Sequence, residues 1–123
     1  MGKGGSYLDP LVEVLSYFVA KRNYGYVDIL TNALDRITVL EAIINAIRDF
    51  EADCASGRPQ SEDIRCPEIP PEKLSQSVEE FQSKIEGLSG AQLMELARSL
   101  SLRALARGGM LRKVGTSGES AAS

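Results

Sequence analysis

The stretch Thr38–Phe50 constrains the fold most, because its apolar residues recur at helical spacing around more than half of a helical wheel. The apolar positions are Val39, Leu40, Ala42, Ile43, Ile44, Ala46, Ile47 and Phe50. A surface helix carries a narrower apolar stripe, so we expect this helix to be covered on several sides. Thr38 and Glu41 have the spacing of a capping box and mark its start. The sequence therefore predicts an all-α single-domain bundle of about five helices around a central buried helix at 38–53.

The flanking helices are predicted from caps and apolar spacing. Asp9-Pro10 begins a first helix, with Asp9 as the N-cap, that runs to about residue 22. A turn over residues 23–26, rich in residues that tolerate positive φ, leads to a short helix at 27–34. We expect a fourth helix at 71–86, ended by Gly87.

The last predicted helix begins with a capping box formed by Ser89 and Gln92. Gly108 and Gly109 should end it. The resulting division is a flexible lead at 1–8, a helical domain at 9–109 with a loop at 55–70, and a disordered tail at 110–123.

Composition narrows the function classes. The chain of 123 residues is 43% hydrophobic and 25% charged, which suits one domain with a modest core. It contains no apolar run of membrane-spanning length, and its glycine-rich start lacks the apolar region of a secretory signal, so we expect a cytoplasmic location. Histidine is absent, which removes the usual general base and the commonest metal ligand. We expect a non-catalytic protein with no cofactor and no metal.

The two cysteines, Cys54 and Cys66, lie on either side of the predicted loop. A zinc site would need carboxylate ligands in place of a second cysteine pair, and we do not expect one. Two interpretations remain, namely two unlinked thiols or a disulfide that closes the loop.

Two groups of residues suit contact with nucleic acid. Around the first turn stand Lys21, Arg22, Tyr24 and Tyr26, with Tyr17 and Asn23 beside them. Aromatic rings stack on bases, and Lys and Arg pair with phosphate. The second group is basic and near the C-terminus: Arg98, Arg103 and Arg107, followed by Arg112 and Lys113. The alternative for both groups is ordinary structure, with half-buried tyrosines at a helix corner and cations matched to the helix dipole.

Two further groups deserve separate interpretations. Met94, Leu102 and Leu105 lie outside the main apolar stripe of the last helix. They indicate either burial inside the domain or contact with another subunit, so we assign them as a candidate oligomer interface. The second group is acidic and consists of Asp49, Glu51, Asp53, Glu62 and Asp63. Carboxylates can hold a hard cation, but without a binding-loop spacing a solvated face is the favoured interpretation.

Three short segments carry a family resemblance: Asn23–Ala33, Val39–Ile43 and Ala46–Asp49. They resemble the small-subunit family of the archaeal subtype I-A CRISPR interference complex. The resemblance implies a mainly helical, non-catalytic subunit that self-associates, docks on larger subunits and helps hold CRISPR RNA or single-stranded target. Tyr24, Tyr26 and Asp28 are the positions that match. The net charge of −3 departs from this pattern and disfavours strong direct binding of nucleic acid.

A different class also fits the sequence. The acidic stretch from Asp49 to Glu86 and the long loop suit a helical adaptor or chaperone-like module that binds one protein and no nucleic acid. RNA binding that weakens steeply with salt would separate the two hypotheses.

Overall fold

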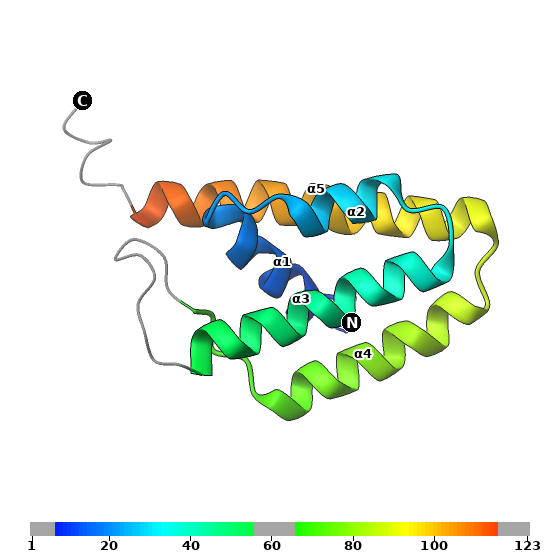
Figure 1. Ribbon diagram of the computed structural model, residues 1–123, viewed down its shortest axis with the longest axis horizontal. Coiled ribbons are helices and arrows are strands. Elements are labelled where there is room, and N and C mark those ends of the chain that lie inside the picture. The colour runs from blue at the N-terminus through cyan, green and yellow to red at the C-terminus, as the bar shows by residue number, and fades with distance from the viewer. Residues whose placement is uncertain (1–6, 56–65, 116–123) are drawn as a thin grey trace, which may run out of the picture.

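The computed structural model describes residues 7–55 and 66–115. These residues form five helices and no strand, namely α1 (Asp9–Ala20), α2 (Gly25–Asn32), α3 (Arg36–Ala55), α4 (Pro71–Glu86) and α5 (Gly90–Gly115). Figure 1 shows α2, α3, α4 and α5 roughly aligned, with α1 crossing behind α3. The prediction of an all-α bundle is confirmed for the described residues.

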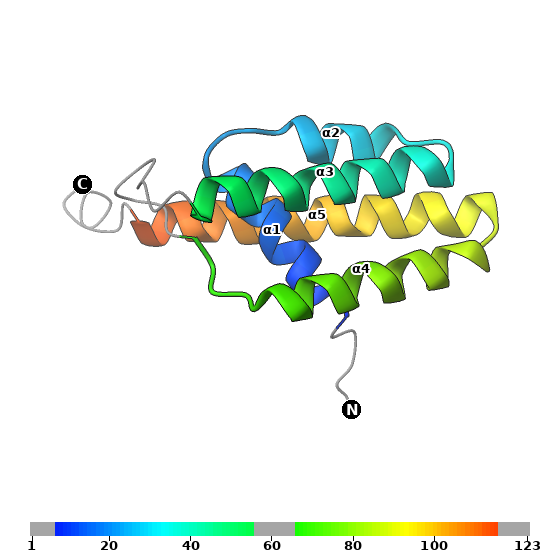
Figure 2. The ribbon, with the colours of Figure 1, turned by 60° about the horizontal axis from the view of Figure 1, so that its bottom comes forward.

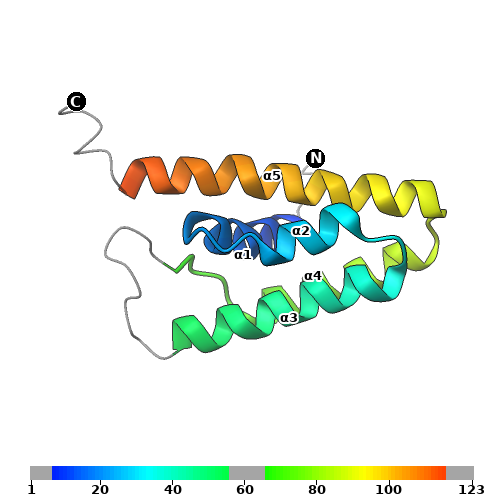
Figure 3. The same ribbon diagram turned by 45° about the horizontal axis from the view of Figure 1, so that its top comes forward.

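The helices form layers with α1 inside. Figure 3 shows α5 along one side, α3 and α4 along the other, and α1 with α2 between them. Figure 2, from another side, also places α1 between α5 and α4. Helix α1 packs most extensively on α5 and also contacts α2, α3 and α4.

The buried centre of the bundle is α1, so the prediction of a central helix at 38–53 is wrong. Every α1 residue from Pro10 to Ala20 is buried except Glu13. Helix α3 buries one stripe, made of Val39, Ala42, Ile43, Ala46 and Phe50. Apolar residues outside that stripe stay partly open because none of the described helices covers the outer side of α3.

Two predicted caps are also wrong. The N-cap of α1 is Leu8, and Asp9 lies in the first turn instead. Helix α3 begins two residues before Thr38, because Asp35 Oδ1 accepts a hydrogen bond from the Thr38 backbone N–H at 2.8 Å. That backbone hydrogen bond lowers the pKa of Asp35. A carboxylate three residues ahead of an amide is an ordinary N-cap, and it replaces the predicted pair of Thr38 and Glu41.

The turn between α1 and α2 uses an unexpected residue. The backbone N–H of Asn23 donates to Phe18 O at 2.8 Å, and that of Arg22 donates to Val19 O at 2.9 Å. This is a Schellman ending, whose left-handed position is usually glycine. Here Arg22 occupies it with φ 66°, so neither Asn23 nor Gly25 supplies the positive φ.

In the second half of the domain, the structure agrees better with the predicted helix ends. Helix α4 ends before Gly87 as predicted. The capping box is confirmed: Ser89 N–H donates to Gln92 Oε1 at 3.0 Å, and Gln92 N–H donates to Ser89 Oγ at 3.2 Å. Helix α5, however, continues through both glycines to Gly115, so the predicted helix end at Gly108 and Gly109 is wrong. Most of the predicted lead, loop and tail, at 1–6, 56–65 and 116–123, lies outside the described residues.

A disulfide joins Cys54 in the last turn of α3 to Cys66, so the interpretation as two unlinked thiols is wrong. The chain then runs through residues 66–70 to α4, and Ile69 packs against the core. The disulfide therefore fixes the end of α3 close to the approach to α4.

Candidate interaction surfaces

A hydrogen-bonded cluster joins the predicted aromatic–basic group to the predicted acidic group. Lys21 Nζ donates to Asp53 Oδ2 at 2.9 Å and to the Tyr17 hydroxyl at 3.3 Å. The Tyr17 hydroxyl donates to the same Asp53 oxygen at 3.1 Å. Lys21 Nζ also lies 4.9 Å from the centroid of the Tyr17 ring, a distance typical of a cation–π contact. These contacts tie the end of α1 to the end of α3.

Tyr26 makes a parallel link from α2 to α3. Its hydroxyl donates to Asp49 Oδ2, and its ring packs on Phe18 with the centroids 5.1 Å apart. Partial burial, followed by the hydrogen bond to Asp49, raises the pKa of Tyr26 to about 12. At Asp53 the hydrogen bond from Lys21 lowers the pKa of the carboxyl. Both acids therefore stabilise contacts between helices.

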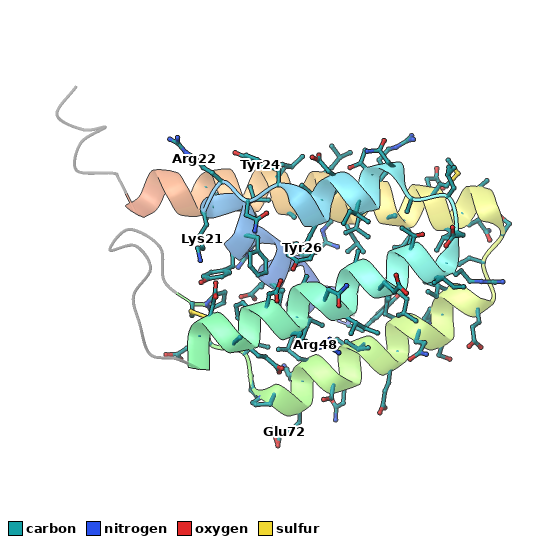
Figure 4. The ribbon with its side chains drawn as sticks, in the orientation of Figure 1. Lys21, Arg22, Tyr24, Tyr26, Arg48 and Glu72 are labelled. Atoms are coloured by element: carbon teal, nitrogen blue, oxygen red, sulfur yellow. A yellow bond between two sulfur atoms is a disulfide. The ribbon has the colours of Figure 1, made fainter. Side chains whose placement is uncertain are left out.

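The side chains of the predicted turn residues do not all point the same way. Figure 4 shows Lys21 pointing toward α3, whereas Arg22 points outward on the opposite side of the turn. Tyr24 also keeps 42% of its surface exposed. Of the four predicted turn residues, Arg22 and Tyr24 remain accessible to a partner, and Lys21 and Tyr26 contribute to the fold.

The predicted C-terminal arginines differ in whether they form an ion pair. Arg103 pairs with Asp9 at 3.2 Å and Arg107 pairs with Glu13 at 3.8 Å, both along the edge of α5 that faces α1. Arg98 is exposed, and within the described part of the chain it forms no ion pair. The side chains of Arg112 and Lys113 lie outside the described residues. The structure therefore pairs two of the three predicted α5 arginines with carboxylates of α1.

The apolar residues of the second group on α5 do share one exposed face. The exposed fractions are 37% for Met94, 60% for Leu102 and 38% for Leu105. Their positions recur at helical spacing, with Arg98 one turn from Met94 and one turn from Leu102. We call these four residues the α5 face. Of the two predicted interpretations, burial inside the domain is wrong, most clearly for Leu102.

The acidic group does not form a metal site in the described part of the chain. No cluster of three or more potential ligands occurs among the described residues. Asp49 and Asp53 bind Tyr26 and Lys21, and Glu51 lies on a groove described next. Glu62 and Asp63 lie outside the described residues.

A groove between α3 and α4 is a feature that the sequence reasoning missed. It has a volume of about 360 Å³ and is lined by Ile44, Ile47, Glu51, Leu74, Ser75, Val78 and Glu79. The sequence feature that could have indicated the groove is a second apolar stripe on α3. The wide apolar surface instead led to the prediction that this helix is covered on several sides. In the structure this stripe is only half covered, by α4.

No family model, curated protein or solved structure matches this chain. None of the described helices combines the length and the apolar character needed to cross a membrane.

Proposed function

We propose that this chain is a non-catalytic assembly subunit that associates with a second copy of itself through the α5 face and docks on larger protein partners. The observation that carries this proposal is the exposure of Met94, Leu102 and Leu105 on one side of a well-formed helix. Three large apolar side chains at helical spacing, none of them part of the buried core, are typical of an interface that a partner buries.

A second copy is a suitable partner because the face is nearly symmetric along the helix. Met94 and Leu105 are three turns apart, with Arg98 and Leu102 between them. In an antiparallel pair of α5 helices, Met94 of one copy would meet Leu105 of the other. A two-fold interface of this kind uses the same patch on both subunits.

The resemblance to the small subunits of archaeal subtype I-A CRISPR complexes suggests a particular assembly, an RNA-guided effector. Arg22 and Tyr24 are the exposed residues available for CRISPR RNA or single-stranded target, because self-association would cover Arg98 in the α5 face. The left-handed conformation of Arg22 supports a role for this side chain, because glycine would fit the position with less strain.

The experiment is size-exclusion chromatography with light scattering, with and without a single-stranded RNA of about 40 nucleotides, a length that spans several basic sites. Assembly beyond a monomer supports the subunit proposal. RNA that co-migrates, is released by salt and is weakened by Arg22→Gln but not by Lys73→Gln supports the nucleic-acid role. A monomer at every concentration, with no RNA bound, would overturn both.

The second candidate function is a helical adaptor that binds protein and no nucleic acid. One observation favours it: Lys21 and Tyr26, half of the predicted turn group, are bonded to Asp53 and Asp49. In the same experiment the adaptor hypothesis predicts no RNA shift at any salt concentration.

A further inference from the structure

Helix α3 carries a second apolar stripe beside the one that packs in the core. Ile37, Leu40, Ile44 and Ile47 are spaced three, four and three residues apart, the spacing of a coiled-coil seam. Ile37 is 69% exposed, and the other three are only partly buried. This stripe spans about three helical turns, or roughly 15 Å.

Two residues of this stripe, Ile44 and Ile47, form the apolar part of one wall of the groove between α3 and α4. Leu74 and Val78 of α4 form the apolar part of the other wall. A cavity of about 150 Å³ holds one benzene-sized group, so a groove of about 360 Å³ has room for roughly two large apolar side chains. The disulfide and the segment 66–70 fix one end of α3 near the approach to α4, which pre-forms the groove.

The edges of the groove are acidic. Glu51 and Glu79 line it directly. Glu72 and Glu86 are seven residues from Glu79 in either direction, so they follow the same outer edge of α4. Figure 4 places Arg48 between the two helices and Glu72 at the start of α4.

Two arginines offset part of this charge: Arg48 lies between α3 and α4 (Figure 4), and Arg36 Nη1 donates to the Glu86 backbone oxygen at 3.2 Å. The lysines of α4 lie away from the groove. Lys73 lies on the other side of α4, in a hollow with Tyr7. Lys84 lies over the Tyr7 ring, 5.8 Å from its centroid. Among the described residues, the groove lining therefore combines apolar side chains with two carboxylates, Glu51 and Glu79, and includes no Lys or Arg.

We propose that this groove binds an amphipathic helix of another protein, whose apolar residues recur every three and four positions and are flanked by Lys or Arg. The spacing of the α3 stripe favours a helix as the occupant, because a docked helix presents anchors at the same intervals. The acidic border favours cationic flanks, which also exclude acidic helices. A second copy is the poorer match, because Arg103 and Arg107 are already paired with Asp9 and Glu13.

This proposal is independent of the α5 face. Figure 3 shows α5 on one side of the bundle and the α3–α4 pair on the other. Self-association through α5 would therefore leave the groove open, and each copy would present one groove to its partner.

The test uses fluorescence anisotropy with a labelled synthetic helix about three heptads long, with Leu at the seam positions and Lys at the flanking positions. The same peptide with Glu in place of Lys is the negative control. The wild-type protein should bind the Lys peptide and not the Glu peptide. Glu79→Lys should weaken binding by about tenfold or more, because it places like charges together.

Glu80→Lys is the matched control, because it makes the same charge change one residue along, on the side of α4 near Tyr7. It should alter the affinity by less than about twofold, as expected for a charge remote from the bound helix. Ile44→Ser, which keeps every charge, should weaken binding as well. Circular dichroism checks that each variant is folded.

Three results would overturn the proposal. Equal loss of binding in Glu79→Lys and Glu80→Lys would mean non-specific attraction to an acidic protein. Loss of binding in Leu102→Glu, with Glu79→Lys unaffected, would place the peptide on the α5 face. Self-association abolished by Glu79→Lys would identify a second copy as the occupant.

Discussion

Alanine substitutions at Gly108 and Gly109 should change stability in opposite directions. A Cβ at Gly108 would lie 2.5 Å from both Cβ and Cγ1 of Val19 and 2.9 Å from the Ser16 backbone oxygen. A Cβ at Gly109 would meet nothing within 4 Å. Gly108 therefore lets α1 and α5 approach closely, whereas Gly109 has no such role.

The magnitude follows from two opposing effects. Replacing glycine by alanine inside a helix stabilises it by about 1 kcal/mol. At Gly108 the new methyl group meets a branched side chain at its Cβ and a backbone oxygen, and neither can move without shifting α1. Such overpacking costs about 3 kcal/mol, so Gly108→Ala should lower the free energy of unfolding by about 2 kcal/mol. Gly109→Ala should raise it by about 1 kcal/mol.

Urea unfolding followed by circular dichroism measures both changes. With a slope of about 2 kcal/mol per molar urea, the midpoint should fall by about 1 M for Gly108→Ala and rise by about 0.5 M for Gly109→Ala. Equal midpoints for the two variants would refute the close crossing of α1 and α5 at Gly108.

Three further predictions concern single residues or one bond. Arg22→Gly should raise the free energy of unfolding by about 1 kcal/mol in the same urea assay, because glycine adopts the left-handed conformation without strain; a loss of stability would contradict this. Replacing Cys54 and Cys66 together by Ser should lower it by about 3 kcal/mol, the value expected for a loop of this length, and dithiothreitol should then have no further effect. Because Lys21 lowers the pKa of Asp53 in the folded state, the stabilisation from Asp53 is present above about pH 4 and is lost as the pH falls through the folded pKa. Between about pH 5 and pH 2 the wild type should therefore lose more stability than Asp53→Asn, and parallel losses would show that this carboxylate is not the cause.

The features that could be predicted from the sequence depend on neighbouring residues. The helix α4, with Leu74, Phe81 and Ile85 buried, follows from apolar spacing. The start of α5 follows from two residues three positions apart, Ser89 and Gln92. Apolar spacing and capping pairs involve residues within one or two helical turns of each other, so they can be recognised in a single sequence.

The features that could not be predicted depend on residues far apart in the chain. Gly108 has the local pattern of a helix end, and only the crossing of α1 explains a glycine inside the helix. Lys21 and Asp53 are 32 positions apart, so nothing local indicates that each satisfies the other. Spacing alone also allowed Cys54 and Cys66 to be bonded or free. On α5, the sequence identified a second apolar face, and the structure was needed to place it on the outside.

Sedimentation velocity over a wide concentration range tests the proposed α5 interface most directly, with wild type, Leu102→Glu and Ser99→Glu compared. Ser99→Glu adds the same charge to another exposed position of α5, outside the α5 face. We expect concentration-dependent association of the wild type and of Ser99→Glu, and a folded monomer for Leu102→Glu. A wild type that stays monomeric throughout, or a Leu102→Glu variant that associates as strongly as the wild type, would contradict this expectation.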